Sequence, residues 1–158
     1  MQRRQLMQAL AAIAGPAIPP ALFAKVQPQV EVWKDPDCGC CKDWVAHLQA
    51  NGFAVRVHDS GNTAARKRLG IPDKLGSCHT AEVSANSKRY ALEGHVPASD
   101  VRRLLKEKPE AVGLTVPGMP VGAPGMDGPI YGQRRDPYEV LLVLKSGDTR
   151  VYSAHNKA

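Results

Sequence analysis

The chain has 158 residues, of which 43% are hydrophobic and 23% are charged, and its formal net charge is +6 at pH 7. This composition is typical of one compact globular domain, and no run approaches the roughly 20 apolar residues that a membrane-spanning helix needs. The basic residues are scattered, with few aromatic residues between them, so the charge, which alone would permit nucleic-acid binding, favours a solvated surface.

The N-terminal residues have the features of an export signal. Arg3 and Arg4 precede an apolar stretch over residues 6–24, which ends at a small residue suited to cleavage. The arginine pair resembles a twin-arginine signal. The alternative, an amphipathic first helix of the domain, is disfavoured because three prolines would interrupt it. We therefore expect a signal peptide over residues 1–24, a mature domain over residues 25–158, and a periplasmic location in which thiols meet an oxidising environment.

The first elements of the mature chain predict a β-α-β unit. Residues 29–34 alternate in the pattern of a strand and carry strand-favouring side chains. A helix is expected from about Cys40 to Asn51, with Gly52 at its C-terminal end. Residues 53–59 alternate again and indicate a second strand.

The remaining elements extend this unit. We expect a short basic helix over residues 63–69, a hairpin over 80–96 that turns at Asn86-Ser87, a helix over 97–108, and a C-terminal hairpin that turns at 146–148. This order of elements predicts an α/β fold, a thioredoxin-like single domain with an added C-terminal β-hairpin.

A long loop rich in glycine and proline is expected near the C-terminal hairpin. Residues 113–132 contain ten Gly or Pro residues in twenty positions. A structureless loop of this length is uncommon inside a compact domain and tends to be functional or disordered. Met119 and Met126, each preceded by Pro-Gly, lie in this loop. They are either soft metal ligands or residues that only fill space.

Three of the four cysteines lie within four positions, in the segment DPDCGCCKDW. Cys38 and Cys41 have Cys-x-x-Cys spacing where a strand meets a helix N-terminus, and the helix dipole there stabilises a thiolate. This arrangement suits a dithiol oxidoreductase or a soft-metal site. Cys40 favours the metal site, because a third thiol promotes scrambling of a disulfide but can bridge the ions of a cluster. Two disulfides, with Cys38–Cys41 as one of them, remain an alternative.

The fourth cysteine, Cys78, precedes His79 at the start of the predicted third strand. In a thioredoxin-like domain this region lies against the dithiol loop, so four thiolates and an imidazole can converge there. Thiolate and thioether ligands together select Cu(I), whereas zinc has little use for methionine. His95, at the end of a strand, is either a ligand or a structural histidine.

The three other histidines are expected to be solvated surface residues: His47, His58 and His155.

Several unusual motifs occur together, namely CGCC, LGIP, SCHTA, LEGHVPA, GLTVPGMP and GAPGM. In order and spacing they resemble a bacterial family of periplasmic copper-resistance proteins of the CopG type, long classed as a domain of unknown function. The resemblance covers about residues 28–153 and implies a thioredoxin-like fold with a cysteine-bridged cluster of copper ions. It makes Cys38, Cys40, Cys41 and Cys78 the bridging ligands. The further candidate ligands are His79, His95, Met119 and Met126.

These observations predict an exported copper-binding protein that holds more than one Cu(I) ion, for copper resistance or homeostasis. A change of copper oxidation state is the enzymatic activity that such a site would support. Copper ions and other periplasmic copper-handling proteins are the expected partners, whereas nucleic acid and stable membrane insertion are not expected. The alternatives are a thiol-disulfide oxidoreductase that uses Cys38 and Cys41, and a zinc-stabilised binding module.

Overall fold

The computed structural model describes residues 27–157, so the predicted signal peptide over residues 1–24 lies outside the described residues. The described chain is a mixed α/β protein with one seven-stranded sheet and three α-helices. The strands are β1 (Gln29–Lys34), β2 (Ala54–His58), β3 (His79–Ala85), β4 (Lys88–Glu93), β5 (Gly113–Thr115), β6 (Tyr138–Val143) and β7 (Thr149–His155). The α-helices are α1 (Gly39–Ala50), α2 (Asn62–Leu69) and α3 (Ala98–Glu107), and the 3-10 helices are η1 (Asp73–Leu75) and η2 (Pro129–Tyr131).

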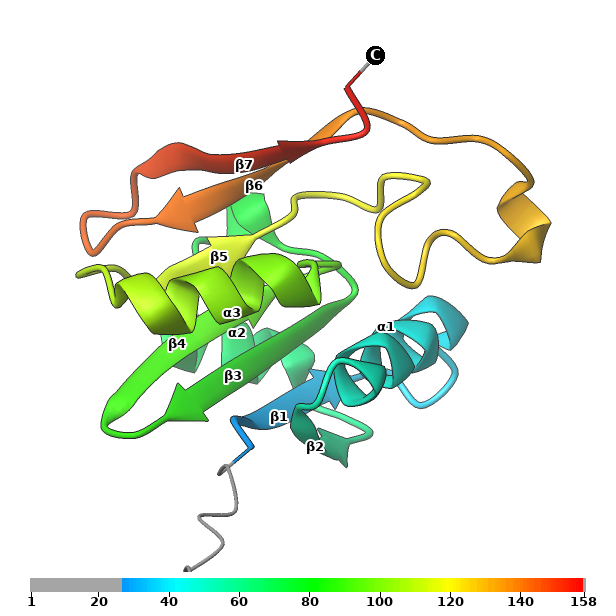
Figure 1. Ribbon diagram of the computed structural model, residues 1–158. Coiled ribbons are helices and arrows are strands. Elements are labelled where there is room, and N and C mark those ends of the chain that lie inside the picture. Colours follow the sequence, from blue (N-terminus) through cyan, green and yellow to red (C-terminus); the bar gives the residue numbers. More distant parts are fainter. Residues whose placement is uncertain (1–26, 158) are drawn as a thin grey trace, which may run out of the picture.

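The strand order in the sheet is β2-β1-β3-β4-β5-β6-β7 (Figure 1). β1 pairs in parallel with β2, and α1 connects the two strands, which confirms the predicted β-α-β opening. On its other side β1 pairs with β3 in antiparallel register, with Lys34 opposite His79. The residues that follow β1 and those that precede β3 therefore emerge at the same edge of the sheet, where the cysteines lie.

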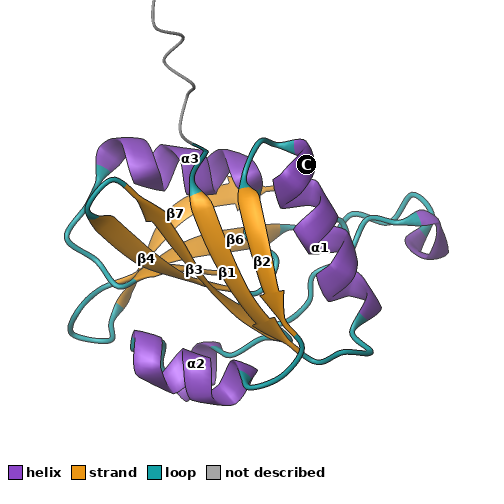
Figure 2. Ribbon diagram, turned by 90° about the horizontal axis from the view of Figure 1, so that it is seen from below, coloured by secondary structure: helices purple, strands orange, loops and turns teal. Residues whose placement is uncertain are grey.

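Helices cover both faces of the sheet (Figure 2). α1 and α3 pack on one face, where Trp44, Leu48 and Leu104 meet the inward side chains of β1, β3 and β4. On the opposite face α2 contacts β1, β3 and β4, and a smaller cluster forms around Ile71 and Leu75. Each fully buried large apolar side chain contributes roughly 1.5–3 kcal/mol to folding, so the larger cluster anchors α1, the helix that carries three cysteines.

The boundaries predicted from sequence agree closely with the structure for β1, α1, α2 and the hairpin of β3 and β4. Gly52 and Gly70 end α1 and α2 with φ values of +77° and +79°. Few residues other than glycine adopt this left-handed conformation without strain, so these glycines stop the helices where the sequence predicts.

The prediction of one structureless loop over residues 113–132 was partly wrong. Gly113–Thr115 form β5, which pairs with both β4 and β6, and Pro129–Tyr131 form η2. The glycine that indicated a loop is required by the strand, because a Cβ at Gly113 would collide with the backbone carbonyl of Ala91. Gly113 therefore permits a close approach between neighbouring strands.

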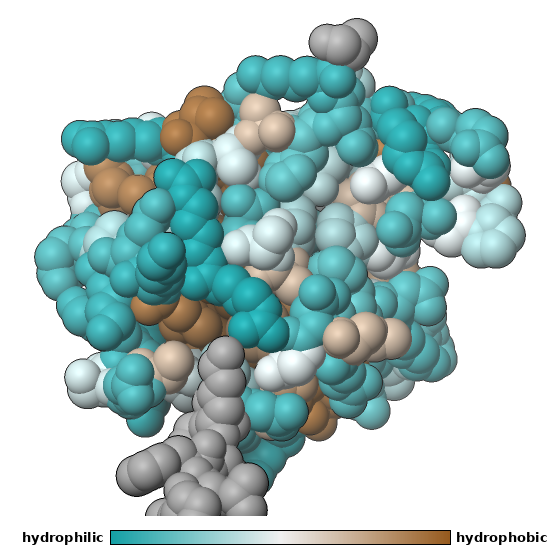
Figure 3. Space-filling model, viewed as in Figure 1, coloured by the Kyte–Doolittle hydropathy of each residue, from teal (hydrophilic) through white to brown (hydrophobic). Residues whose placement is uncertain are grey.

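The face of the molecule seen in Figure 3 is largely hydrophilic, with small separated hydrophobic areas. Val57, Met119, Ile130 and Val151 are the large hydrophobic residues that are exposed within residues 27–157. No α-helix in this described range is long and apolar enough to cross a lipid bilayer.

Candidate metal centre

Three cysteines lie at the N-terminus of α1. Cys38 is the N-cap residue, with an extended backbone (φ −70°, ψ 97°), and Cys40 and Cys41 follow in the first turn. Asp35 turns the chain into the helix, because its side chain accepts the Asp37 N–H at 2.9 Å and its carbonyl accepts the Cys38 N–H at 3.2 Å. The local sequence thus places these sulfur atoms beside the positive end of the helix dipole.

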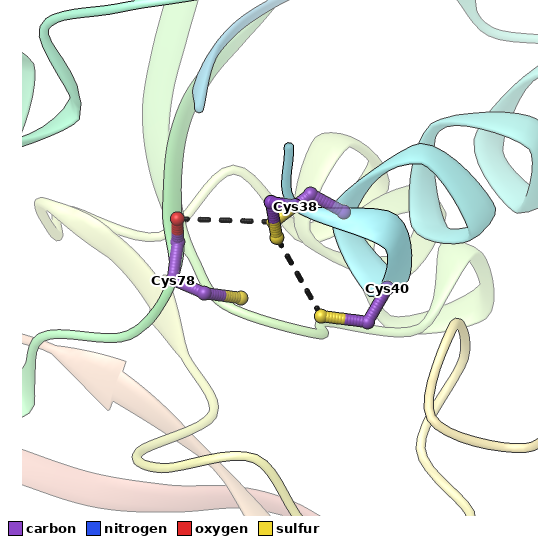
Figure 4. Close-up of side chains that lie close together, drawn as sticks. Cys38, Cys40 and Cys78 are labelled. Carbon is purple, nitrogen blue, oxygen red and sulfur yellow. Dashed lines mark hydrogen bonds between the residues drawn. A yellow bond between two sulfur atoms is a disulfide. The ribbon is translucent and has the colours of Figure 1, made fainter. Parts of the chain in front are cut away.

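Cys38 and Cys41 form a disulfide with a Cα–Cα distance of 5.3 Å, and Cys40 and Cys78 are free thiols. The alternative of two disulfides is therefore wrong for the described residues, which contain this one disulfide. Cys40 Sγ lies 3.6 Å from Cys38 Sγ, and the sulfur atoms of Cys38, Cys40 and Cys78 point into a common space between α1 and the start of β3 (Figure 4). All four cysteine sulfurs lie within 4.8 Å of one another.

Two buried imidazoles lie against the Cys78 sulfur, at 3.3 Å from His79 Nδ1 and 3.2 Å from His95 Nε2. His95 Nδ1 lies 2.8 Å from the carbonyl oxygen of Pro124, which can only accept a hydrogen bond. Nδ1 therefore carries the proton, and the lone pair of Nε2 faces Cys78. A backbone carbonyl commonly fixes the tautomer of a metal-binding histidine in this way.

His79 is completely buried, and its Nε2 atom has no hydrogen-bond partner. Its ring packs against Trp44, with the ring centroids 4.3 Å apart, while the Trp44 indole donates to the carbonyl of Val96 at 2.9 Å. An unpaired buried nitrogen is costly in a native protein. A bound water would satisfy it, whereas an ion shared with Cys78 would bind Nδ1, the nitrogen that faces that sulfur.

Burial sets the protonation states of these groups. It lowers the pKa of His79 to about 3 and also lowers the pKa of His95, so both rings are neutral at pH 7 and able to bind metal. Burial, together with the nearby Cys40 thiol, raises the pKa of Cys78 to about 12. The metal-free Cys78 is therefore a thiol, and an ion that binds it must displace its proton.

The Gly/Pro-rich segment, residues 113–132, contacts the start of α1 through Gly125. At Gly125, where φ is +84°, a Cβ atom would lie 2.5 Å from the Cys40 carbonyl oxygen and 2.8 Å from the backbone nitrogen of Trp44. Met126 is buried, and its sulfur accepts a hydrogen bond from the Tyr131 hydroxyl at 3.3 Å. Met119 is 52% exposed. The structure thus brings together the four cysteines, His79 and His95, whereas the contacts of the described residues place neither methionine sulfur against them.

A buried ion pair that was not predicted from the sequence lies next to Cys78. Glu93, at the end of β4, is inaccessible to solvent and lies 2.9 Å from the guanidinium of Arg66 on α2. Burial raises the pKa of Glu93, and hydrogen bonds from Thr80, Ser77 and Arg66 act in the opposite direction. The only sequence signal was an acidic residue at the end of an otherwise apolar strand segment, YALE.

The prediction that three histidines are simply solvated was wrong for two of them. His47 Nε2 accepts the Ala98 N–H at 3.1 Å and so joins α1 to the start of α3. His155 lies 2.8 Å from the carboxylate of Asp100 and ties β7 to the same helix. His58 is partly exposed and stacks on Trp33.

The fold and the site define a class of protein: a single-sheet α/β protein with a candidate metal centre of four cysteines and two histidines. Two solved structures, described as form 1 and form 2 of the copper resistance protein CopG, are 43% and 42% identical to the chain. Each has a TM-score of 0.72 and matches 82% of this chain, and the match spans 98% and 99% of the respective CopG chains. The chain belongs to the family of CopG copper resistance proteins, which confirms the resemblance seen in the sequence.

A family model described as "Protein of unknown function, DUF411" matches residues 75–126, the part that contains Cys78, His79 and His95. No curated protein sequence matches the chain.

Proposed function

We propose that the chain binds copper ions in a cluster bridged by Cys38, Cys40, Cys41 and Cys78, and that it acts in copper resistance or homeostasis. The single observation that supports this most is the approach of all four sulfur atoms to within 4.8 Å of one another. Thiolates are soft ligands and favour Cu(I). The similarity to CopG copper resistance proteins supports copper over other soft ions.

The charge of the ligands favours several ions over one. Four thiolates around a single Cu(I) would leave a net charge of −3 in a site where Cys41 is buried and the other cysteines are half-buried. Uncompensated charge is expensive in such a setting. Several Cu(I) ions bridged by shared thiolates reduce the charge, and bridging matches sulfur atoms that lie so close together.

Cys38 and Cys41 must be reduced before they bind metal. An external dithiol reductant supplies the two electrons and two protons for this step and becomes a disulfide itself, and the two cysteine thiols lose their protons to the solvent when copper binds. His79 and His95 are neutral and buried, so we propose them as nitrogen ligands at the edge of the cluster. Transfer of one electron from Cu(I) to an external acceptor such as dioxygen, which would leave Cu(II), is the redox reaction that we propose for the loaded site.

We also propose Met119 and Met126 as thioether ligands that are secondary to the cysteines. They would close the site from the side of the Gly/Pro-rich segment. The position of Gly125 supports this, since it brings the backbone of the segment into close contact with the Cys40 carbonyl oxygen. The test is a double Met→Leu variant, because a volume-conserving apolar exchange usually costs under about 1.5 kcal/mol of stability. Unchanged Cu(I) affinity and unchanged air oxidation in that variant would remove both residues from the site.

A second candidate is a thiol-disulfide oxidoreductase. The disulfide between Cys38 and Cys41 at the N-terminus of α1 supports it, because this is the arrangement of dithiol enzymes. The order β1-α1-β2, the following hairpin and α3 also support a thioredoxin-like domain with the β6-β7 hairpin added. A single zinc ion held by the same cysteines is the third candidate.

We further propose that residues 1–24 direct export and that the domain over residues 25–158 works in the periplasm. Other periplasmic copper-handling proteins would then be its exchange partners. The charged and apolar segments of the N-terminal sequence support this proposal.

Metal analysis of protein purified anaerobically from the periplasm separates these functions. Several copper ions per chain are expected. One zinc ion per chain would support the zinc module, and a metal-free protein that reduces disulfides would support the oxidoreductase.

Cys78→Ser provides the matched comparison with Cys38→Ser. In a copper cluster both variants lose copper, because a hydroxyl cannot replace a bridging thiolate. In an oxidoreductase only Cys38→Ser abolishes activity. Full copper content in Cys78→Ser would refute the cluster.

A further inference from the structure

The segment Gly76–Cys78 joins η1 to β3 without regular secondary structure, yet its central residue is held on three sides. The Ser77 N–H donates to Glu93 Oε1 at 2.6 Å, and the Ser77 carbonyl accepts from Arg66 Nη2 at 2.8 Å. The Ser77 hydroxyl donates to the carbonyl of Gly118 at 2.7 Å. One residue is thus bonded to β4, to α2 and to the Gly/Pro-rich segment.

A buried ion pair supplies two of these three bonds. The Glu93 side chain is 0% exposed and that of Arg66 is 12% exposed. Arg66 Nε donates to Glu93 Oε1 at 2.9 Å, so one guanidinium binds both the carboxylate and the Ser77 carbonyl. Glu93 Oε2 accepts from the Thr80 hydroxyl at 2.6 Å, two residues after Cys78. The pair therefore fixes the chain on both sides of Cys78.

Two glycines admit this arrangement. A Cβ at Gly76 would lie 2.8 Å from Arg66 Cζ, and a Cβ at Gly94 would lie 2.7 Å from the Ser77 hydroxyl oxygen. Gly94 also has a φ of +71°, which few other residues adopt. The absence of a side chain at Gly76 leaves room for the Arg66 guanidinium, and its absence at Gly94 leaves room for Ser77. The local backbone therefore accommodates the ion pair and the residue that it holds.

A buried ion pair is weak evidence of a contribution to stability, since apolar replacements of similar volume are often neutral or better. A conformational role explains it more directly. Cys78 Sγ must lie within contact of His79, of His95 and of the cysteines of α1, and a small displacement of Ser77 would end these contacts.

We propose that Arg66 and Glu93 are positioning residues for the metal centre, which hold Ser77 so that the Cys78 sulfur faces Cys40 and the two imidazoles. The effect of Arg66 and Glu93 on copper binding rests on the proposed function. Their effect on the position of the Cys78 thiol does not, so the two effects are tested separately.

The first test needs no metal. With the Cys38–Cys41 disulfide intact, Cys40 and Cys78 are the free thiols, and dibromobimane becomes strongly fluorescent when it links two neighbouring thiols. We expect Arg66→Met to reduce the rate of this cross-link severalfold. Lys67→Met, which removes a charge from the exposed neighbour on α2, is the matched control and should react like the wild-type protein. Equal rates in all three proteins would overturn the proposal.

The second test is a double-mutant cycle on Cu(I) affinity, measured by competition with a chelator. Partners behind a metal ligand typically contribute 10- to 100-fold in affinity, so Arg66→Met should weaken Cu(I) binding by about that factor. Cys78→Ser loses the bridged cluster but keeps three thiols, and the same change should have almost no further effect on the Cu(I) affinity that these thiols retain, because Arg66 acts through Cys78. Equal weakening in both backgrounds would show a general structural role and overturn the proposal.

Arg66→Lys keeps the charge but cannot bind Glu93 and Ser77 as a fork, and it serves if Arg66→Met does not fold. Its cross-link rate and its Cu(I) affinity should both be lower than those of the wild-type protein, and wild-type values of both would overturn the role of the fork. If the wild-type protein binds no copper but the cross-link rates differ as expected, the proposed function fails and the positioning role stands.

Discussion

Gly125→Ala tests whether the Gly/Pro-rich segment is seated on the metal centre. Gly125 has a φ of +84°, and a Cβ would lie 2.5 Å from the Cys40 carbonyl oxygen and 2.8 Å from the Trp44 nitrogen. Both neighbours are backbone atoms of α1, which cannot rotate away. The segment must therefore move, and with it the Pro124 carbonyl that fixes the His95 tautomer at 2.8 Å.

The expected cost has two parts. The left-handed backbone costs a residue with a Cβ roughly 1–2 kcal/mol, and overpacking against fixed atoms costs about 1–3 kcal/mol. Gly118→Ala isolates the first part, because Gly118 has a φ of +73° and a Cβ there would meet nothing within 4 Å. Gly128→Ala is the control for the added methyl group, since Gly128 has neither a positive φ nor a close neighbour.

Urea unfolding of the reduced, metal-free protein measures these costs. We expect a loss of roughly 2–5 kcal/mol for Gly125→Ala, about 1–2 kcal/mol for Gly118→Ala, and almost none for Gly128→Ala. Cu(I) affinity should fall in Gly125→Ala alone, because only that variant displaces the partner of His95. Equal stability and equal affinity in Gly125→Ala and Gly118→Ala would refute the seating of the segment on α1.

Three further outcomes are expected. Oxidation of Cys38 and Cys41 to their disulfide should remove most copper-binding capacity, and a reductant should restore it; equal copper content in oxidised and reduced protein, by elemental analysis, would contradict this. Burial lowers the pKa of His47, so its contribution to stability is complete above the unfolded value of about 6.5 and is lost as pH falls below it. His47→Gln should therefore lose less stability than the wild-type protein in urea unfolding between about pH 7 and about pH 5, and an equal loss in both proteins would contradict this role of His47. Replacement of Arg3 and Arg4 by lysine should block export to the periplasm, as seen by cell fractionation, whereas normal export would indicate the general secretion route.

The sequence by itself determined the features that depend on neighbouring residues. Alternation predicted β1, helical spacing predicted α1, and glycines that tolerate a positive φ predicted where α1 and α2 end. The placement of Cys38, Cys40 and Cys41 at a helix N-terminus also follows from local sequence, because a strand, a turn at Asp35 and a helix occur in immediate succession.

Only the tertiary structure decided which distant groups meet. The approach of Cys78 to the cysteines of α1 was expected only by likeness to a thioredoxin-like domain. The contact itself depends on the pairing of β1 with β3, with Lys34 opposite His79, and strand pairing is a long-range choice that one segment does not encode. Arg66 and Glu93 are 27 residues apart and meet because α2 covers the sheet face behind β4. A lone basic and a lone acidic residue carry no periodic signal, so their burial becomes evident only when the layers pack. The same holds for Gly113, since its role in β5 is set by the approach of the Ala91 backbone and not by its own neighbours.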